Sequence, residues 1–282
     1  MSSLVITIPF DPVFQLGPLP VHWYGVGYAV AFAVGFMVSN RYLRSRGISD
    51  SQLGSLGFWA VVIGLLAGRL YFVVQSGLGY YLTHPVHIFA FWEGGMAFYG
   101  ALFAVPITIA VFCRRLRLPL WIVLDGAALF AAIGQTIGRL GNIINGDILG
   151  FPSNLPWAIR YTSPHTLAPV RGVAYQPANA YELLFSLALF GFLVWLSTRR
   201  PRPGTLIIVY VALYAIGQFL IFFLRDNVVI AFGLKQAQLT SLVVLAVGVP
   251  LLLLLRRRWP TVWTPNAFDD APVLGSRLSS AP

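Results

Sequence analysis

The sequence has little charge. Only 10% of its 282 residues are Asp, Glu, Lys or Arg, while 57% are hydrophobic. A soluble domain carries roughly 25% charged residues, so this composition excludes an ordinary water-soluble fold. Cysteine and lysine are nearly absent, with Cys113 the single cysteine and Lys235 the single lysine. One cysteine excludes an internal disulfide.

The chain instead has long apolar runs. Seven of them are long enough to cross a membrane, which takes about 20 helical residues each. They lie near 22–40, 55–75, 95–113, 120–140, 179–197, 204–224 and 237–255. Arginine triplets follow the first, third, fifth and seventh runs. By the positive-inside rule, we expect an all-α protein with seven transmembrane helices, its N-terminus outside and its C-terminus cytoplasmic.

The domain organisation follows from these runs. We expect one transmembrane domain over residues 1–258, with a long external loop at about 142–178, and a disordered cytoplasmic tail over 259–282. No basic segment precedes the first run, so we expect no cleaved signal peptide. The net charge of +10 does not indicate nucleic-acid binding, because the basic residues form short clusters between apolar runs.

The stretch 134–147 carries the most informative pattern. It begins as an apolar helix and is expected to end as a polar loop. Helical spacing puts Gln135, Arg139 and Asn142 on one face. Three glycines share that spacing on a neighbouring face, where another backbone can come close: Gly134, Gly138 and Gly141. An arginine at the end of a membrane helix, beside amides and small residues, is suited to hold a phosphate.

Other ionisable residues also lie within or beside the apolar runs. Each costs roughly 2.5–3.5 kcal/mol at a helix centre, so such residues are rare and tend to be functional. They are Arg69, Glu93, Asp125, Arg139, Asp147, Glu182 and Arg225. All but Asp125 fall at the expected outer ends of their helices, which indicates one polar chamber. The sixth run adds a stripe of Tyr214, Gln218 and Arg225 on one face, and the first run places Tyr24 near its outer end.

Structural interpretations of these residues stay open. A structural alternative for Arg139 is an ion pair with Glu182 or Asp147. Glu182 follows Asn179 at the spacing of a capping box, which alone would explain it. Arg69 and Arg225 suit interfacial anchors, and the four histidines lack the paired spacing of a metal site.

Six segments resemble the prolipoprotein diacylglyceryl transferases of bacterial inner membranes. They are 22–25 (HWYG), 68–70 (GRL), 92–100 (WEGGMAFYG), 138–150 (GRLGNIINGDILG), 175–182 (YQPANAYE) and 223–225 (FLR). The fourth is similar to the family's signature, and the resemblance extends from about residue 21 to 258. It implies transfer of a diacylglyceryl group from phosphatidylglycerol to the lipobox cysteine of a preprolipoprotein.

The resemblance also implies roles for individual residues. It assigns Arg139 to the lipid phosphate, Asp147 and Glu182 to orienting the arginine or the peptide, and Tyr99 to hydrogen bonding or, less favourably, proton transfer. The remaining lipid-binding set is Asn142, Gly146, Tyr24, Gln218, Arg69 and Arg225. It implies no metal and no cofactor. The expected partners are phosphatidylglycerol, the signal peptide with its lipobox cysteine and the bilayer, around a monomer in the bacterial inner membrane.

Four positions depart from the family pattern. Tyr99 stands where the family has a histidine, Gln218 where it has an arginine, and Phe222 where it has a glutamate. Asp147 also replaces a family glutamate, whose side chain is one carbon longer. A lost charge at a dry phosphate site costs rate, at about 1.4 kcal/mol for each factor of ten. A family-derived lipid-binding protein without catalysis is therefore the second hypothesis, and an enzyme with another lipid or acceptor is the third.

Overall fold

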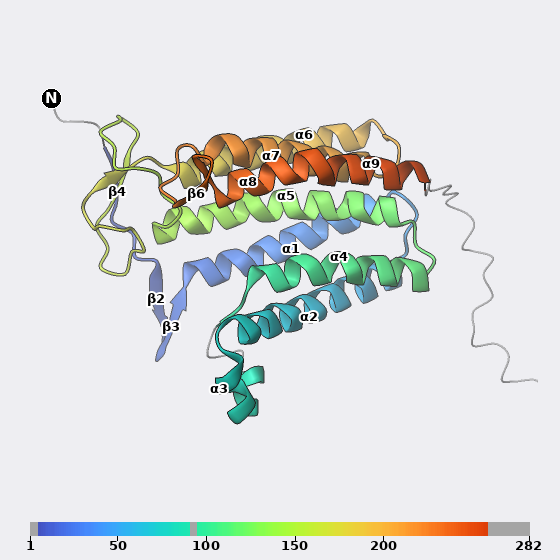
Figure 1. Ribbon diagram of the computed structural model, residues 1–282, viewed down its shortest axis with the longest axis horizontal. Coiled ribbons are helices and arrows are strands. Elements are labelled where there is room, and N and C mark those ends of the chain that lie inside the picture. The colour runs from blue at the N-terminus through green and yellow to red at the C-terminus, as the bar shows by residue number, and fades with distance from the viewer. Residues whose placement is uncertain (1–4, 91–94, 259–282) are drawn as a thin grey trace, which may run out of the picture. The chain divides into compact units, whose positions relative to one another are not determined.

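The computed structural model describes residues 5–90 and 95–258 (Figure 1). The expected tail and Glu93 lie outside this part. The described residues form two compact units. The first unit comprises residues 5–39 and 124–258, and the second comprises 40–90 and 95–123.

A helix lies on each of the seven predicted runs. These helices are α1 (Trp23–Arg44), α2 (Asp50–Gln75), α4 (Phe98–Arg115), α5 (Leu120–Asn145), α6 (Ala178–Thr198), α7 (Thr205–Ile221), and α8 (Gln236–Val243) with α9 (Val249–Arg258). A π-helical turn, Val244–Gly248, joins the last two. Among the described residues, four helical segments are long and apolar enough to cross a membrane: Asp50–Gln75, Leu120–Asn145, Ala178–Thr198 and Gln236–Arg258. The chain is thus a mostly helical membrane protein.

Short strands accompany the helices, so the all-α prediction is wrong in this detail. One sheet joins β1 (Ile6–Ile8), β4 (Ile159–Tyr161) and β5 (Ala174–Tyr175) in the order β1-β4-β5. Two hairpins pair β2 (Val13–Leu16) with β3 (Leu19–His22), and β6 (Val229–Ala231) with β7 (Leu234–Lys235). Strands of two to four residues are too short to display the alternation over four to eight residues that predicts a strand.

The long loop after α5 is folded. Its strand β4 pairs in parallel with β1, and Leu149, Ile159, Tyr161 and Tyr175 form a buried apolar cluster beneath it. The long loop therefore has a small hydrophobic core of its own.

In the first unit, α5 also fixes the start of α7. Asp125 is fully buried, and its carboxylate accepts hydrogen bonds from the backbone N–H groups of Gly204 (2.8 Å) and Ile207 (3.0 Å). These N–H groups have no intrahelical partner at a helix start, so a carboxylate from a neighbouring helix satisfies them. This contact gives Asp125 a structural role at the end of the helices opposite the C-terminus of α5.

In the second unit, α2 packs closely on α4. A Cβ at Gly100 would lie 2.1 Å from the carbonyl oxygen of Ala67, so only glycine permits this approach. Beyond α2 the chain forms α3 (Leu78–Thr83) and a 3-10 turn, Pro85–Phe89. These short elements frame Arg69, described below.

Candidate active site at the C-terminal end of α5

The helix α5 continues further than expected. It ends at Asn145, so Asn142 lies on its last turn and not in a loop. Gly146 follows with a φ of 78°, and its N–H donates to the carbonyl oxygen of Asn142 at 2.9 Å. A Cβ at Gly146 would lie 2.3 Å from Oγ1 of Thr166. This position therefore requires glycine, both for its left-handed backbone and for the close packing of the loop.

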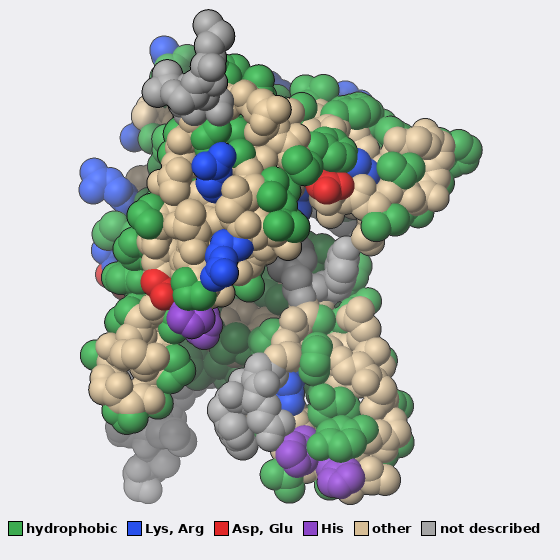
Figure 2. Space-filling view, turned by 90° about the vertical axis from the view of Figure 1, so that its left-hand side faces the viewer, with side chains coloured by type: hydrophobic (Ala, Val, Ile, Leu, Met, Phe, Trp, Pro, Cys, Tyr) green, Lys and Arg blue, Asp and Glu red, His purple; other side chains and the backbone are tan. Residues whose placement is uncertain are grey.

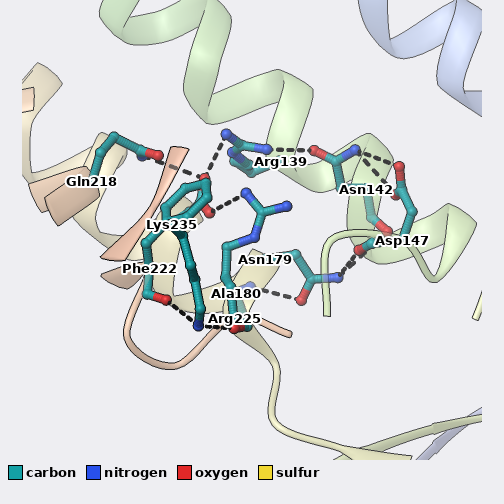
Figure 3. A network of polar contacts seen from close by, with 10 residues as sticks. Arg139, Asn142, Asp147, Asn179, Ala180, Gln218, Phe222, Arg225 and Lys235 are labelled. Atoms are coloured by element: carbon teal, nitrogen blue, oxygen red, sulfur yellow. Dashed lines mark hydrogen bonds and ion pairs between the residues drawn. The ribbon is translucent and has the colours of Figure 1, made fainter. Parts of the chain in front are cut away.

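The fully buried carboxylate of Glu182 contacts three side chains of a polar network, and Figure 3 labels these three as Arg139, Gln218 and Arg225. Its Oε2 is 2.5 Å from Nη2 of Arg139, and its Oε1 is 3.3 Å from Nη1 of Arg225. The amide of Gln218 donates to Oε2 at 3.4 Å. Three helical segments distant in sequence thus meet at one carboxylate. The proposed capping box is wrong, since α6 has Pro177 at its N-cap and no side-chain cap hydrogen bond.

A second branch of the network runs from Arg139 to Asp147. Nη1 of Arg139 donates to Oδ1 of Asn142 at 3.1 Å, and Nδ2 of Asn142 donates to both carboxylate oxygens of Asp147 at 3.0 and 3.1 Å. Burial raises the pKa of Asp147, against the lowering effect of these hydrogen bonds and of the two arginines. Asp147 therefore orients Asn142 without forming a direct salt bridge to Arg139.

Arg225 has spare hydrogen-bonding capacity. Its guanidinium lies 4.4 Å from the ring centroid of Phe222, and among the described residues its buried Nε has no hydrogen-bond partner. Burial lowers its pKa, while the Glu182 carboxylate opposes that shift. The side chains of Arg139 and Arg225 are each 13% exposed, so both remain within reach of a ligand.

The sequence reasoning missed the structural roles of two residues here. Asn179 is fully buried, and its Nδ2 donates to the carbonyl oxygen of Asp147 at 3.0 Å. Lys235 is buried, and its ammonium donates to the carbonyl oxygens of Phe222 (2.7 Å) and Arg225. The sequence indicated Asn179 only as part of a capping box, and no local pattern indicated the contacts of Lys235.

Tyrosines border the network. Tyr214, on the stripe predicted for α7, stacks on Tyr210 with the ring centroids 5.6 Å apart. The hydroxyl of Tyr24 lies 2.9 Å from that of Tyr28, and a Cβ at Gly141 would lie 2.9 Å from the Tyr24 ring. Gly141 therefore leaves room for the ring of Tyr24. The predicted close approach of a backbone is wrong, within the described part of the chain, at the other two glycines of the face, where a Cβ would meet no described atom within 4 Å: Gly134 and Gly138.

Two predicted site residues belong to the second unit. Arg69 is buried, and it donates to the carbonyl oxygens of His87 (2.5 Å), Ile88 (3.0 Å) and Gly95 (3.0 Å). Its hydrogen bonds hold the segment after α2 in place. The side chain of Tyr99 lies outside the described part, so its assigned role stays a prediction.

The arrangement is suited to binding an anion. Two guanidinium groups share the single carboxylate of Glu182, which leaves one positive charge uncompensated at that point. Asp147 contributes a second carboxylate, joined to Arg139 through Asn142. Arginine forks match the geometry of phosphate oxygens. Over the described residues, no group of three or more His, Cys, Asp or Glu side chains lies close enough to hold a metal ion.

Comparison with known proteins identifies the family. The model of the prolipoprotein diacylglyceryl transferase family matches residues 11–254. A phosphatidylglycerol–prolipoprotein diacylglyceryl transferase of Bordetella avium is 38% identical over 260 residues, covering 88% of this chain and 96% of that protein. A protein of the same name from Thermosynechococcus vestitus is 37% identical over 238 residues, covering 83% and 88%. The chain belongs to the prolipoprotein diacylglyceryl transferase family.

Proposed function

We propose that this chain transfers the diacylglyceryl group of phosphatidylglycerol to the thiol of a lipobox cysteine in a preprolipoprotein. The relatives' names give the donor lipid and the prolipoprotein acceptor. The observation that carries the proposal for this chain is the sharing of the buried Glu182 by Arg139 and Arg225. This pair supplies the positive charge that a phosphodiester requires within a membrane.

The reaction exchanges one bond for another. The cysteine sulfur forms a bond to the glyceryl carbon, the bond from that carbon to the phosphate oxygen breaks, and glycerol phosphate leaves. The thiol must lose its proton, because thiolate is the nucleophile and a free thiol has a pKa near 8.5. The proton ends on the departing glycerol phosphate, which balances the reaction. Negative charge grows on the leaving phosphate, and arginines already fixed in a low-dielectric site stabilise it without rearranging.

The residues have distinct parts in this scheme. Arg139 binds the phosphate, while Glu182 fixes the orientation of its guanidinium. Asn142 joins Arg139 to Asp147 and presents its amide beside the phosphate. Arg225 is the second phosphate ligand, since its Nε is unpartnered within the described residues. Gln218 and Tyr24 complete the polar lining, and Tyr99 remains the proposed donor from α4.

We place the site at the outer face of a bacterial inner membrane. The arginine triplets support seven spans, with the N-terminus outside and the C-terminus cytoplasmic. In that orientation, the C-terminal end of α5 faces the compartment where a secreted cysteine and a phospholipid can meet. The proposed enzyme acts as a monomer, with the lipid entering from the bilayer.

A second function is favoured by one observation. Gln218 occupies the position of a family arginine, and its amide contacts Glu182 at 3.4 Å without bringing a positive charge. A protein that binds the lipid without transferring it would fit such a site.

The deciding experiment measures transfer directly. The full chain is assayed with phosphatidylglycerol and a lipobox peptide, and expressed in cells depleted of their own transferase. We expect a thioether-linked peptide and restored growth. Folded protein that binds the lipid but gives no thioether product would establish the second function instead.

The variant Gln218→Arg separates the two functions further. It places a third guanidinium beside Glu182, so we expect the transfer rate to stay equal or to rise. The matched control is Gln218→Leu, which removes the amide without adding charge. A sharp loss of rate in Gln218→Arg with intact folding would show that this site is built around glutamine.

A further inference from the structure

The hairpin β6–β7 has an unusual turn. The pairing of Ala231 with Leu234 leaves Phe232 and Gly233 as its two central residues. Both have positive φ, 53° and 71°, as a type I′ turn requires. Asn, Asp or Gly normally occupies the first central position, because a bulky residue is strained there. Here a phenylalanine accepts this strain, and its side chain is 94% exposed.

The exposed side chains around this turn are apolar. Val228 is 82% exposed and Ile230 is 60% exposed, and residues 227–234 contain no charged side chain. Charge lies only at the base, at Asp226 and Lys235. Figure 2 faces the end of the molecule that carries the strands, where hydrophobic side chains lie exposed between basic ones.

The base of the hairpin is fixed. The ammonium of Lys235 donates to the carbonyl oxygens of Phe222 and Arg225, and lies 5.0 Å from the ring centroid of Phe151. Gly150 also forms a β-bridge with Arg225. The tip thus projects from a rigid base whose anchoring segment carries Arg225, a residue of the proposed site.

The neighbouring elements indicate what covers the tip. The hairpin lies between the apolar helix α7 and the segment Gln236–Arg258, which is long and apolar enough to cross a membrane. The helix α7 is apolar but shorter, and a short connection from it to a segment that can cross a membrane cannot extend far from the membrane surface. An apolar tip on a charged base matches the boundary between acyl chains and headgroups, where aromatic side chains are favoured.

We infer that the β6–β7 hairpin inserts its tip, with Phe232 at the apex, into the lipid boundary beside the proposed site. The exposed Phe232 is then a membrane anchor. Lys235 links the hairpin to Arg225 through a hydrogen bond to the Arg225 carbonyl oxygen. The anchor therefore also sets the depth of Arg225 relative to the lipid headgroups. The hairpin β2–β3 differs, because Gly17 carries its positive φ and its turn needs no strained apolar residue.

The scarcity of cysteine makes a direct test available. Cys113→Ala removes the one thiol, and Phe232→Cys then gives a single site for a nitroxide label in the full chain. The labelled protein is reconstituted into vesicles of phosphatidylcholine and phosphatidylglycerol. Relaxation of the label by oxygen, which concentrates in lipid, is compared with relaxation by a water-soluble nickel chelate. Arg171→Cys, at an exposed charged position of the long loop, is the control.

We expect a higher ratio of oxygen to nickel relaxation at position 232 than at 171. Equal access of nickel to both labels would place the tip in water and overturn the inference. Protection from both agents would mean that protein covers the tip, and would overturn it as well. This measurement needs no transfer activity, so its failure is distinguishable from a failure of the proposed reaction.

The variant Phe232→Asn tests the anchor without labelling the apex. Asparagine tolerates positive φ, so the turn itself should fold at least as well, seen as an unchanged or higher Tm in detergent. A label at Val229→Cys, also without Cys113, should nevertheless lose oxygen accessibility when Phe232→Asn is added. Unchanged oxygen accessibility would show that Phe232 does not hold the hairpin in lipid.

Discussion

The two units each bury an arginine, and the two arginines have different kinds of partner. Arg139 in the first unit contacts the carboxylate of Glu182 and the amide oxygen of Asn142. Arg69 in the second unit donates to three backbone carbonyl oxygens. Carbonyl oxygens are neutral, and the backbone sets their positions. Hydrogen bonds from a guanidinium to such oxygens favour a structural role for the arginine. In a network of charged and amide side chains, hydrogen bonds can instead be exchanged when a phosphate binds.

The difference teaches how to interpret arginines in apolar helices. Both residues follow glycine in the sequence, as Gly-Arg-Leu, and both are mostly buried. Composition and burial therefore do not separate a structural arginine from a functional one. We propose that the carboxylate and amide acceptors of Arg139 mark it as the functional one, and the predictions below test that proposal.

The largest effect is expected for Arg139→Ala. Removing a donor that stabilises charge in a transition state costs about 10²- to 10³-fold in rate, so we expect transfer to fall at least that far. Arg139→Lys keeps the charge without the planar fork and should recover part of the rate. The control is Leu140→Ala, because Leu140 is exposed on the same helix. Full transfer by Arg139→Ala would place the phosphate elsewhere.

Arg69→Ala should act on stability. It leaves three part-buried carbonyl oxygens without this donor, and a fully buried unsatisfied group costs roughly 1–3 kcal/mol. We expect a clearly lower Tm in detergent and less folded protein, but an unchanged rate per folded molecule. Normal Tm with lost transfer would contradict this assignment and return Arg69 to the lipid-binding set.

Asp125→Asn should have a smaller effect on the fold. The carboxylate accepts two backbone N–H groups at the start of α7, and loss of a helix cap costs about 0.5–2 kcal/mol. We expect a modest fall in Tm without a change in KM for the lipid. Asp125→Ala, which removes both acceptors, should lower Tm further. A change in KM with Tm preserved would be incompatible with a capping role.

The smallest effect belongs to an exposed pair. Oδ2 of Asp11 lies 2.8 Å from Nδ1 of His165, and hydrogen bonds from Val13 and His165 lower the pKa of Asp11 below 3.8. The stabilising contribution of Asp11 is therefore complete above its unfolded pKa and is lost as the pH falls through the lower folded pKa. Below pH 4, the Tm of Asp11→Asn should depend slightly less on pH than the Tm of the unchanged protein. An identical pH dependence would show that the pair contributes nothing.

The sequence predicted some contacts and failed on others for physical reasons. Arg139, Glu182 and Arg225 were grouped at the outer ends of their helices, and the structure brings these three together. The cap assigned to Asn179 was wrong, because its amide reaches the Asp147 carbonyl on another segment. The role of Lys235 was not predicted, because its acceptors lie at the end of α7 and no pattern in the sequence specifies that pairing.

The sequence by itself determined the membrane character and the family. Long apolar runs are stable within a membrane. The residues of segment 138–150 are specific to the family, and they can be recognised without knowledge of their contacts. Only the tertiary structure decided that Arg139 and Arg225 share the Glu182 carboxylate, that α5 extends to Asn145, and that a strained phenylalanine lies at the tip of a hairpin. The physical reason is that hydropathy is a local property, whereas hydrogen-bond partners and backbone strain depend on segments far apart in the chain.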